Sequence, residues 1–155
     1  MRSFVIGIAD TARDDVRALL QAHQTFARSV MPREAVHTLD AQAITDEQIT
    51  LLGLRENDEL LGIGAIRQLE PGHVEIKTMH TTATARRRGV GRALLDHILE
   101  VAAAQGATRV SLETGAGDAF RPARSLYTAA GFVPCDAFGE YEASPVNTFL
   151  TRSLE

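Results

Sequence analysis

The sequence is poor in the features that mark secreted and membrane proteins. Its 155 residues include a single cysteine, Cys135, so no disulfide can form within the chain. No stretch approaches the roughly 18 consecutive apolar residues that indicate a membrane span. The first residues lack the long apolar run and the small-residue cleavage site of a secretory signal. We therefore expect a cytoplasmic protein with no membrane partner.

Positive charge is also in short supply. Sixteen lysines and arginines are outnumbered by 20 aspartates and glutamates, which gives a formal net charge of −4. No overall positive field would draw this chain to nucleic acid. Aromatic residues make up only 5% of the chain and do not interleave with its arginines. No nucleic-acid partner is expected, and any anion site must be local.

Metal-ligand spacing is absent as well. The five histidines form no pattern such as His-Glu-x-x-His, so we expect no metal cofactor. The overall composition is otherwise ordinary, with 45% hydrophobic and 23% charged residues. A chain of this length fits one hydrophobic core. We expect a single domain over residues 1–155.

Hydrophobic periodicity predicts an α/β protein. A short strand is expected over residues 4–9, followed by an amphipathic helix over 13–28 that Asp10 or Thr11 would cap. The segment 33–46 is ambiguous and leaves room for a second short helix.

The central part of the chain predicts a mixed sheet. Three strands joined by tight turns indicate an antiparallel meander, and a helix between two strands indicates a parallel crossover. We expect strands over 48–55, 60–69, 73–81, 109–114, 132–135 and 148–154, and helices over 90–105 and 120–130. The predicted fold class is α/β (α+β), with a central, mostly antiparallel mixed sheet and helices on both faces.

A loop rich in arginine and glycine lies between the third predicted strand and the helix that follows. It reads Arg86-Arg87-Arg88-Gly89-Val90-Gly91. Glycine lets the backbone approach a ligand and adopt positive φ. The unpaired N–H groups of a first helical turn favour anions, above all phosphate. The alternative is a solvated basic turn that only caps the helix. The loop is not a P-loop, because Arg92 and Ala93 follow it instead of Lys and Ser or Thr.

The pattern Arg86-x-x-Gly89-x-Gly91 resembles the coenzyme A loop of the general-control-related N-acetyltransferase (GNAT) superfamily. A helix with Tyr127, followed by Gly131-Phe132, is similar to the late helix of that family. Two motifs in the right order are more specific than either alone. Shorter segments resemble a branch of small stand-alone bacterial acetyltransferases. They are Glu75-Ile76-Lys77-Thr78-Met79, Leu112-Glu113-Thr114-Gly115 and Phe138-Gly139-Glu140-Tyr141.

The resemblance implies a GNAT-like fold and an N-acetyltransferase. The reaction would move the acetyl group of acetyl-CoA, a co-substrate, to a primary amine of a small-molecule or amino-acid-like acceptor. Direct attack in a ternary complex is expected, because Cys135 is the only thiol and has no evident activating partner. Because members of this family commonly form dimers, the resemblance also implies a homodimer. The alternative is a non-catalytic module that binds coenzyme A as a sensor or interaction domain.

The resemblance also assigns cofactor-binding residues. They are Met79, His80, Thr81, Arg86, Arg87, Arg88, Gly89, Val90, Gly91 and Arg92. The pantetheine arm would lie beside Met79 to Thr81 like an added strand, with the Met79 N–H stabilising the oxyanion. Many members carry Asn at the position of Phe120, where it contacts that arm. Backbone or Asp118 would have to replace this contact.

Acetylation of an amine calls for a base and an acid. A lysine-like amine, with a pKa of about 10.4, loses its proton at pH 7 at a cost of about 4.6 kcal/mol. Glu75 is the candidate base, placed like the base glutamate of the histone-modifying branch, and Glu113 or water is the alternative. Glu75 could instead only pair with Lys77 or an arginine. Tyr127 is the candidate acid, its hydroxyl facing the thioester sulfur by resemblance, and the alternative is a core aromatic.

The acceptor pocket of this fold is built by the early helices and a late loop. In the first region a carboxylate could be bound by Arg28, Arg33 and His37. The late loop offers Phe138, Tyr141 and Asn147. For each of these residues an ordinary surface or packing role is the alternative.

Overall fold

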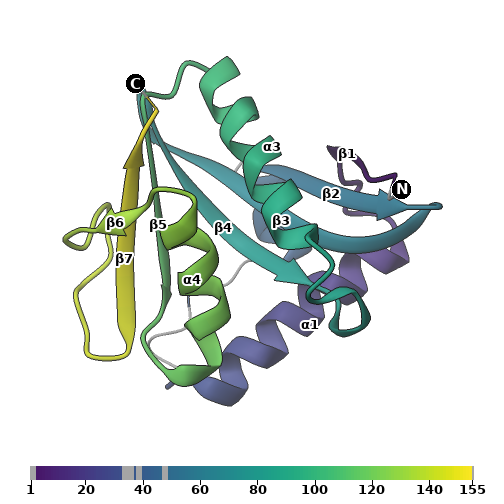
Figure 1. Cartoon of the computed structure of the whole chain (residues 1–155), viewed down its shortest axis with the longest axis horizontal. Helices are drawn as coiled ribbons and strands as arrows, with labels where there is room; N and C mark the ends of the chain where they lie inside the picture. The colour runs from purple at the N-terminus through teal and green to yellow at the C-terminus, as the bar shows by residue number, and fades with distance from the viewer. Residues whose placement is uncertain (1–2, 33–36, 38–39, 47–48, 155) are drawn as a thin grey trace.

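The computed structural model describes residues 3–32, 37, 40–46 and 49–154. Seven strands of this part form one sheet in the order β1-β2-β3-β4-β5-β7-β6 (Figure 1). They are β1 (Val5–Ile8), β2 (Thr50–Glu56), β3 (Glu59–Glu70), β4 (His73–Thr81), β5 (Arg109–Gly115), β6 (Val133–Pro134) and β7 (Asn147–Ser153). All neighbours are antiparallel except β4 and β5, which are parallel. The predicted meander and crossover are confirmed.

Helices cover both faces of the sheet, as predicted. They are α1 (Asp14–Val30), α2 (Ala41–Asp46), α3 (Val90–Ala104) and α4 (Arg121–Ala129), with 3₁₀ turns η2 (Ala83–Ala85) and η3 (Asp118–Phe120). Figure 1 shows α3 and α4 in front of the sheet and α1 behind it. Of the described helices, none combines the length and apolarity that crossing a bilayer requires.

Two apolar cores lie on the two faces because strand side chains alternate. On β2, Leu52 belongs to the core that contains Leu95 of α3, whereas its neighbour Leu51 belongs to the core that contains Leu20 of α1. The short helix α2 adds Ile44 to the α1 side. It lies in the segment 33–46, for which the sequence leaves room for a second short helix, and residues 33–36 and 38–39 fall outside the described residues.

The predicted cap of α1 is wrong. The residue before the helix is Arg13, which makes no capping hydrogen bond with its side chain. The carboxylate of Asp10 instead accepts the N–H of Ala12 at 2.8 Å, so it closes the turn that precedes the helix. Thr11 lies in the same turn. Acidic residues in the first turn, beginning with Asp14, complement the helix dipole in place of a cap.

The sheet divides in the middle. The parallel pairing of β4 with β5 runs from His73 opposite Arg109 to Ile76 opposite Leu112. Beyond Ile76, β4 stays paired with β3, while β5 stays paired with β7 as far as Gly115. The sheet therefore has two halves with an opening between them. One half contains β1, β2, β3 and β4, and the other contains β5, β7 and β6.

Candidate active site

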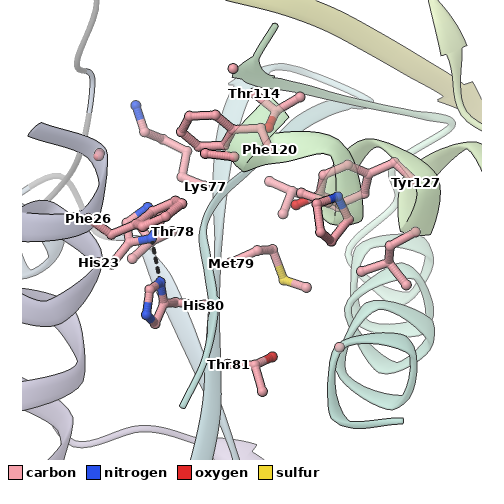
Figure 2. Close-up of a pocket in the computed structure, with 18 of the residues that line it drawn as sticks. His23, Phe26, Lys77, Thr78, Met79, His80, Thr81, Thr114, Phe120 and Tyr127 are labelled. Carbon is pink, nitrogen blue, oxygen red and sulfur yellow. Dashed lines mark hydrogen bonds between the residues drawn. The ribbon is translucent and has the colours of Figure 1, made fainter. Parts of the chain in front are cut away.

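A cavity of about 650 Å³ lies where β4 and β5 part. Its walls come from the last residues of β4 and β5, the first turn of α3, the inner side of α4 and the second half of α1. Figure 2 shows Met79 and Tyr127 on one side of β4, and His23, Phe26 and His80 on the other. Side chains from both faces of the sheet thus reach one space.

The first turn of α3 forms one end of this cavity. Gly89 precedes the helix with φ +81°, a left-handed conformation that only glycine adopts without strain. The N-cap residue is Gly89, which makes no side-chain capping hydrogen bond, and the first residues of α3, Val90 and Gly91, line the cavity. Uncapped N–H groups at the positive end of a helix are suited to bind phosphate.

The arginine side chains in and after the loop differ in their contacts. Arg86 and Arg87 are exposed and line the cavity. Arg92 lines it as well and forms an ion pair with Asp96 at 3.0 Å. The guanidinium of Arg88, by contrast, pairs with Glu56 of β2, and Arg88 is not among the lining residues. Of the predicted cofactor-binding set, every member except Arg88 lines the cavity.

Strand β4 carries a bulge beside the opening. Lys77 is opposite Ala65 of β3 and His80 is opposite Ile63, so Thr78 and Met79 together face one residue of β3. Thr78 has φ +58°, a strained conformation for a β-branched residue. Its buried hydroxyl has no hydrogen-bond partner within the described chain. Strain of this kind is concentrated at functional sites.

Glu75, the candidate base, is buried on the α1 side of the sheet, with 1% of its surface exposed. Its Oε2 accepts a hydrogen bond from the hydroxyl of Tyr141 at 2.6 Å. Burial raises the pKa of Glu75, while Lys77 and the Tyr141 hydroxyl act in the opposite direction. A carboxylate with a raised pKa takes up a proton more readily than an exposed one.

Tyr127, the candidate acid, reaches the cavity from α4 on the opposite face, with 5% of its surface exposed. Its ring packs edge-on against Phe132, with 5.8 Å between ring centroids. Burial raises the pKa of Tyr127 well above its ordinary value. The hydroxyl therefore keeps its proton and is a donor throughout the neutral range.

Glu113, the alternative base, is bound by two donors. Its two oxygens each lie 2.8 Å from Nδ1 of His37, and its Oε2 accepts from Asn147 at 2.6 Å. Both partners line the cavity, and a role of theirs in binding the acceptor stays a prediction. The other predicted residues differ: Arg28 is exposed away from the cavity lining, and Arg33 falls outside the described residues.

Phe138 and Tyr141, predicted to line the acceptor pocket, are not among the residues that line the cavity. They pack against each other edge-on, with 5.5 Å between ring centroids. Tyr141 reaches Glu75 from behind the cavity wall.

A histidine pair was not predicted from the sequence. Nδ1 of His23 on α1 lies 3.0 Å from Nδ1 of His80 on β4 (Figure 2). One nitrogen must donate and the other accept, so at least one ring is neutral. Burial lowers the pKa of His23 to about 4, with a smaller effect from His80, and burial also lowers the pKa of His80. The only signal in the sequence was a histidine at an apolar position of the α1 helix.

The His23 pair should make stability depend on pH. The unfolded chain binds a proton at His23 near pH 6.5 and the folded chain only near pH 4, so stability falls as pH drops below 6.5. Between pH 7.5 and 5.0 this loss is about 2 kcal/mol. In His23→Gln the decrease in the free energy of unfolding between these two pH values, measured by urea unfolding, should be smaller by that amount. In His97→Gln, whose side chain is remote from the cavity, the free energy of unfolding should decrease as much as in the wild type. An equal drop in His23→Gln contradicts this prediction.

Phe120 occupies the cavity wall at the end of β5. Its ring packs 5.3 Å from that of Phe26 on α1 and lies directly over Gly115. A Cβ at Gly115 would be 2.1 Å from Phe120 Cδ2. The position where many family members carry Asn is thus filled here by an aromatic ring, and Gly115 leaves room for it.

Gly115→Ala should therefore displace the Phe120 ring and destabilise the fold by about 1–3 kcal/mol. Gly117→Ala is the matched control, because a Cβ there meets no atom within 4 Å. Its free energy of unfolding should stay within about 0.5 kcal/mol of the wild type. Urea denaturation measures both. Equal stability of the two variants would show that the wall is not tightly packed.

The comparisons with known proteins agree with this geometry. A model of the acetyltransferase (GNAT) family matches residues 15–132. The chain belongs to the GNAT family. The uncharacterized N-acetyltransferase YsnE of Bacillus subtilis (strain 168) is 38% identical over 149 residues, which cover 96% of this chain and 99% of YsnE. The IAA acetyltransferase of Azospirillum brasilense is 33% identical over 155 residues, 99% of this chain and 100% of that protein.

Solved GNAT structures share the fold. A GNAT acetyltransferase from Staphylococcus aureus Mu50 matches with a TM-score of 0.76 at 17% identity, over 99% of this chain and 100% of the other. The predicted family and the GNAT-like mixed sheet are confirmed. This GNAT protein is therefore an acyltransferase of the N-acetyltransferase class.

Proposed function

We propose that this GNAT enzyme transfers the acetyl group of acetyl-CoA to a primary amine of a small-molecule or amino-acid-like acceptor, by direct attack in a ternary complex. One observation carries the proposal. Glu75 and Tyr127 lie on opposite faces of the sheet, yet both line the cavity where β4 and β5 part. A base on one side and an acid on the other are what a displacement through this opening needs.

The residues around the cavity fit the coenzyme. Gly89 and the uncapped first turn of α3, with Arg86 and Arg87 nearby, would bind its phosphates. His80 and Thr81 of β4 pair with β3 on one side, and among the described residues the pairing of β4 with β5 ends at Ile76, so the pantetheine arm would bind beside residues 79–81 like an added strand. The bound coenzyme supplies the reactive thioester. Arg88 would contribute through its backbone, since its side chain pairs with Glu56.

The side chains would then divide the proton transfers between them. Glu75 takes the proton of the acceptor ammonium, directly or through one water. The neutral amine would form its bond to the carbonyl carbon as the carbon–sulfur bond breaks, and the Met79 N–H would donate a hydrogen bond to the oxyanion. Tyr127 would donate its proton to the departing sulfur, and the second proton that the nitrogen loses as the amide forms would return to Tyr127 through solvent.

The residues on the acceptor side of the cavity favour a small polar molecule as the acceptor. The cavity there is lined by Glu75, Lys77, Glu113, His37 and Asn147, which offer both charges and several hydrogen-bonding groups. One relative is named as an IAA acetyltransferase, which also supports a small-molecule acceptor.

Calorimetric titration with acetyl-CoA tests the proposal first. The wild type should bind it in the micromolar range and more tightly than ATP or NADH at the same salt concentration. Gly89→Glu should abolish binding, because it strains a residue at φ +81° and adds negative charge to the phosphate site. Gly106→Glu is the control, with the same kind of change at φ +90° and the far end of α3. Wild-type affinity in Gly89→Glu would refute the phosphate site.

Tyr127→Phe should lower kcat by about 100-fold or more, because the leaving sulfur loses its proton donor. Its Kd for acetyl-CoA should stay within about twofold, since one hydroxyl at the reacting end contributes little to ground-state binding. Thiol release with an amine found by screening measures kcat, and calorimetry measures Kd. Unchanged turnover, with chemistry shown to be rate-limiting, would remove Tyr127 from the acid role.

A further inference from the structure

The burial of Glu75 creates a difficulty for its role as a base. A carboxyl group with 1% of its surface exposed is driven toward the protonated form, and a protonated carboxyl cannot take a proton from an amine. A base in this position needs partners that favour the carboxylate. The proposed function therefore depends on what surrounds Glu75.

Tyr141 connects Glu75 to a positive charge. Its hydroxyl donates to Oε2 of Glu75 at 2.6 Å and accepts a hydrogen bond from Nζ of Lys77 at 2.7 Å. The ammonium thus polarises the hydroxyl that holds the carboxylate, and hydrogen bonds that involve charged groups are the stronger ones. A chain of two short hydrogen bonds joins cation to anion.

The two oxygens of Glu75 have different surroundings. Tyr141 lies behind the wall, outside the cavity lining, and engages Oε2. Oε1 is buried and has no hydrogen-bond partner among the described residues, although Glu75 itself lines the cavity. An unsatisfied buried oxygen in a cavity wall is a ready partner for a polar group of a ligand.

We propose that Tyr141 is the positioning residue of Glu75: with Lys77 it fixes Oε2 behind the cavity wall and leaves Oε1 as the atom that takes the acceptor's proton. This inference rests on the proposed function, in which Glu75 is the base. The proton moves from the acceptor nitrogen to Oε1, and Tyr141 keeps its own. Burial and the neighbouring carboxylate raise the pKa of the Tyr141 hydroxyl far above the neutral range.

Other charged groups also face Glu75. Arg67 lies directly across on β3 and favours the carboxylate, whereas Glu113 on β5 opposes it. The imidazole of His37 packs against the Tyr141 ring, with 4.9 Å between ring centroids, and it is hydrogen-bonded to Glu113. Tyr141 is the one among these that hydrogen-bonds to Glu75 in the described chain.

The surroundings of Tyr141 allow a clean substitution. The rings of Phe138 and Phe149 pack against the Tyr141 ring, with 5.5 and 6.1 Å between ring centroids. Lys77 Nζ lies 5.3 Å from the centroid of its ring, within cation–π range. In Tyr141→Phe these contacts remain and only the hydroxyl is lost, so the variant is expected to fold.

Carbon-13 NMR of the labelled glutamate carboxyl groups tests the inference without any acceptor. The Glu75 signal is assigned by its loss in Glu75→Gln. In Tyr141→Phe the midpoint of its titration should move up by about one pH unit, because a hydrogen bond to the charged form is lost. Lys77→Gln should also move it up. Phe138→Leu, which weakens the packing but keeps the hydroxyl, should leave it near the wild-type value. No shift in Tyr141→Phe, or an equal shift in Phe138→Leu, would overturn the inference.

The pH dependence of kcat/KM separates this inference from the proposed function. With an amine found by screening, the acidic limb of the Tyr141→Phe profile should move to higher pH by the same amount as the NMR midpoint, with activity recovered at alkaline pH. A merely structural role would lower activity at every pH and leave the limb in place, which would also overturn the inference. If Glu75→Gln keeps the wild-type profile, Glu75 is not the base: the base role in the proposed function fails, and this inference fails with it. If Glu75→Gln loses activity while the NMR midpoint does not move in Tyr141→Phe, the inference alone fails.

Discussion

The short pairing between β4 and β5 is the constraint on which the rest of this structure depends. The two parallel strands pair at four positions, from His73 to Ile76 on β4, and then separate. A continuous sheet would keep its two faces apart, because side chains on opposite faces cannot meet through a hydrogen-bonded ladder. The separation lets Glu75 and Tyr127 line one cavity. The bulge at Thr78 and Met79 lies where β4 loses its second neighbour, at the point where this backbone would bind a ligand.

Burial then sets the protonation of the groups in the cavity, and neighbours decide their roles. It raises the pKa of Glu75 and of Tyr127 alike, and it lowers the pKa of His23 and His80. Among the described residues no charged group lowers the pKa of Tyr127 again, which suits a proton donor. For Glu75 the hydroxyl of Tyr141 and the charge of Lys77 oppose it, which suits a proton acceptor. Burial raises the pKa of both groups, and their different neighbours suit them to the opposite roles proposed for them, base and acid.

Patterns local in the sequence predicted most of the fold and part of the candidate site. The bounds of β4 follow from its alternation and its flanking turns, and Gly89 and Tyr127 follow from short motifs before and within helices. Contacts between distant positions could not be predicted in this way. The pairs Glu75 with Tyr141 and His23 with His80 arise only when separate elements pack together. The failed Asp10 cap has a similar origin, because a turn competed for the same carboxylate.

Side-chain contacts also join the two halves of the sheet around the opening. Phe26 on α1 meets Phe120, which follows the end of β5, and Lys77 on β4 reaches Tyr141, which precedes β7. Each contact joins the β1–β4 half to the β5–β6 half across or beside the cavity. Arg124 of α4 adds hydrogen bonds to carbonyls of the turn that carries Phe120, at 2.7 and 2.8 Å. The Phe120 ring therefore links α1 to the end of β5 through its contacts with Phe26 and Gly115, at a position where the family resemblance predicts a polar contact to the pantetheine arm.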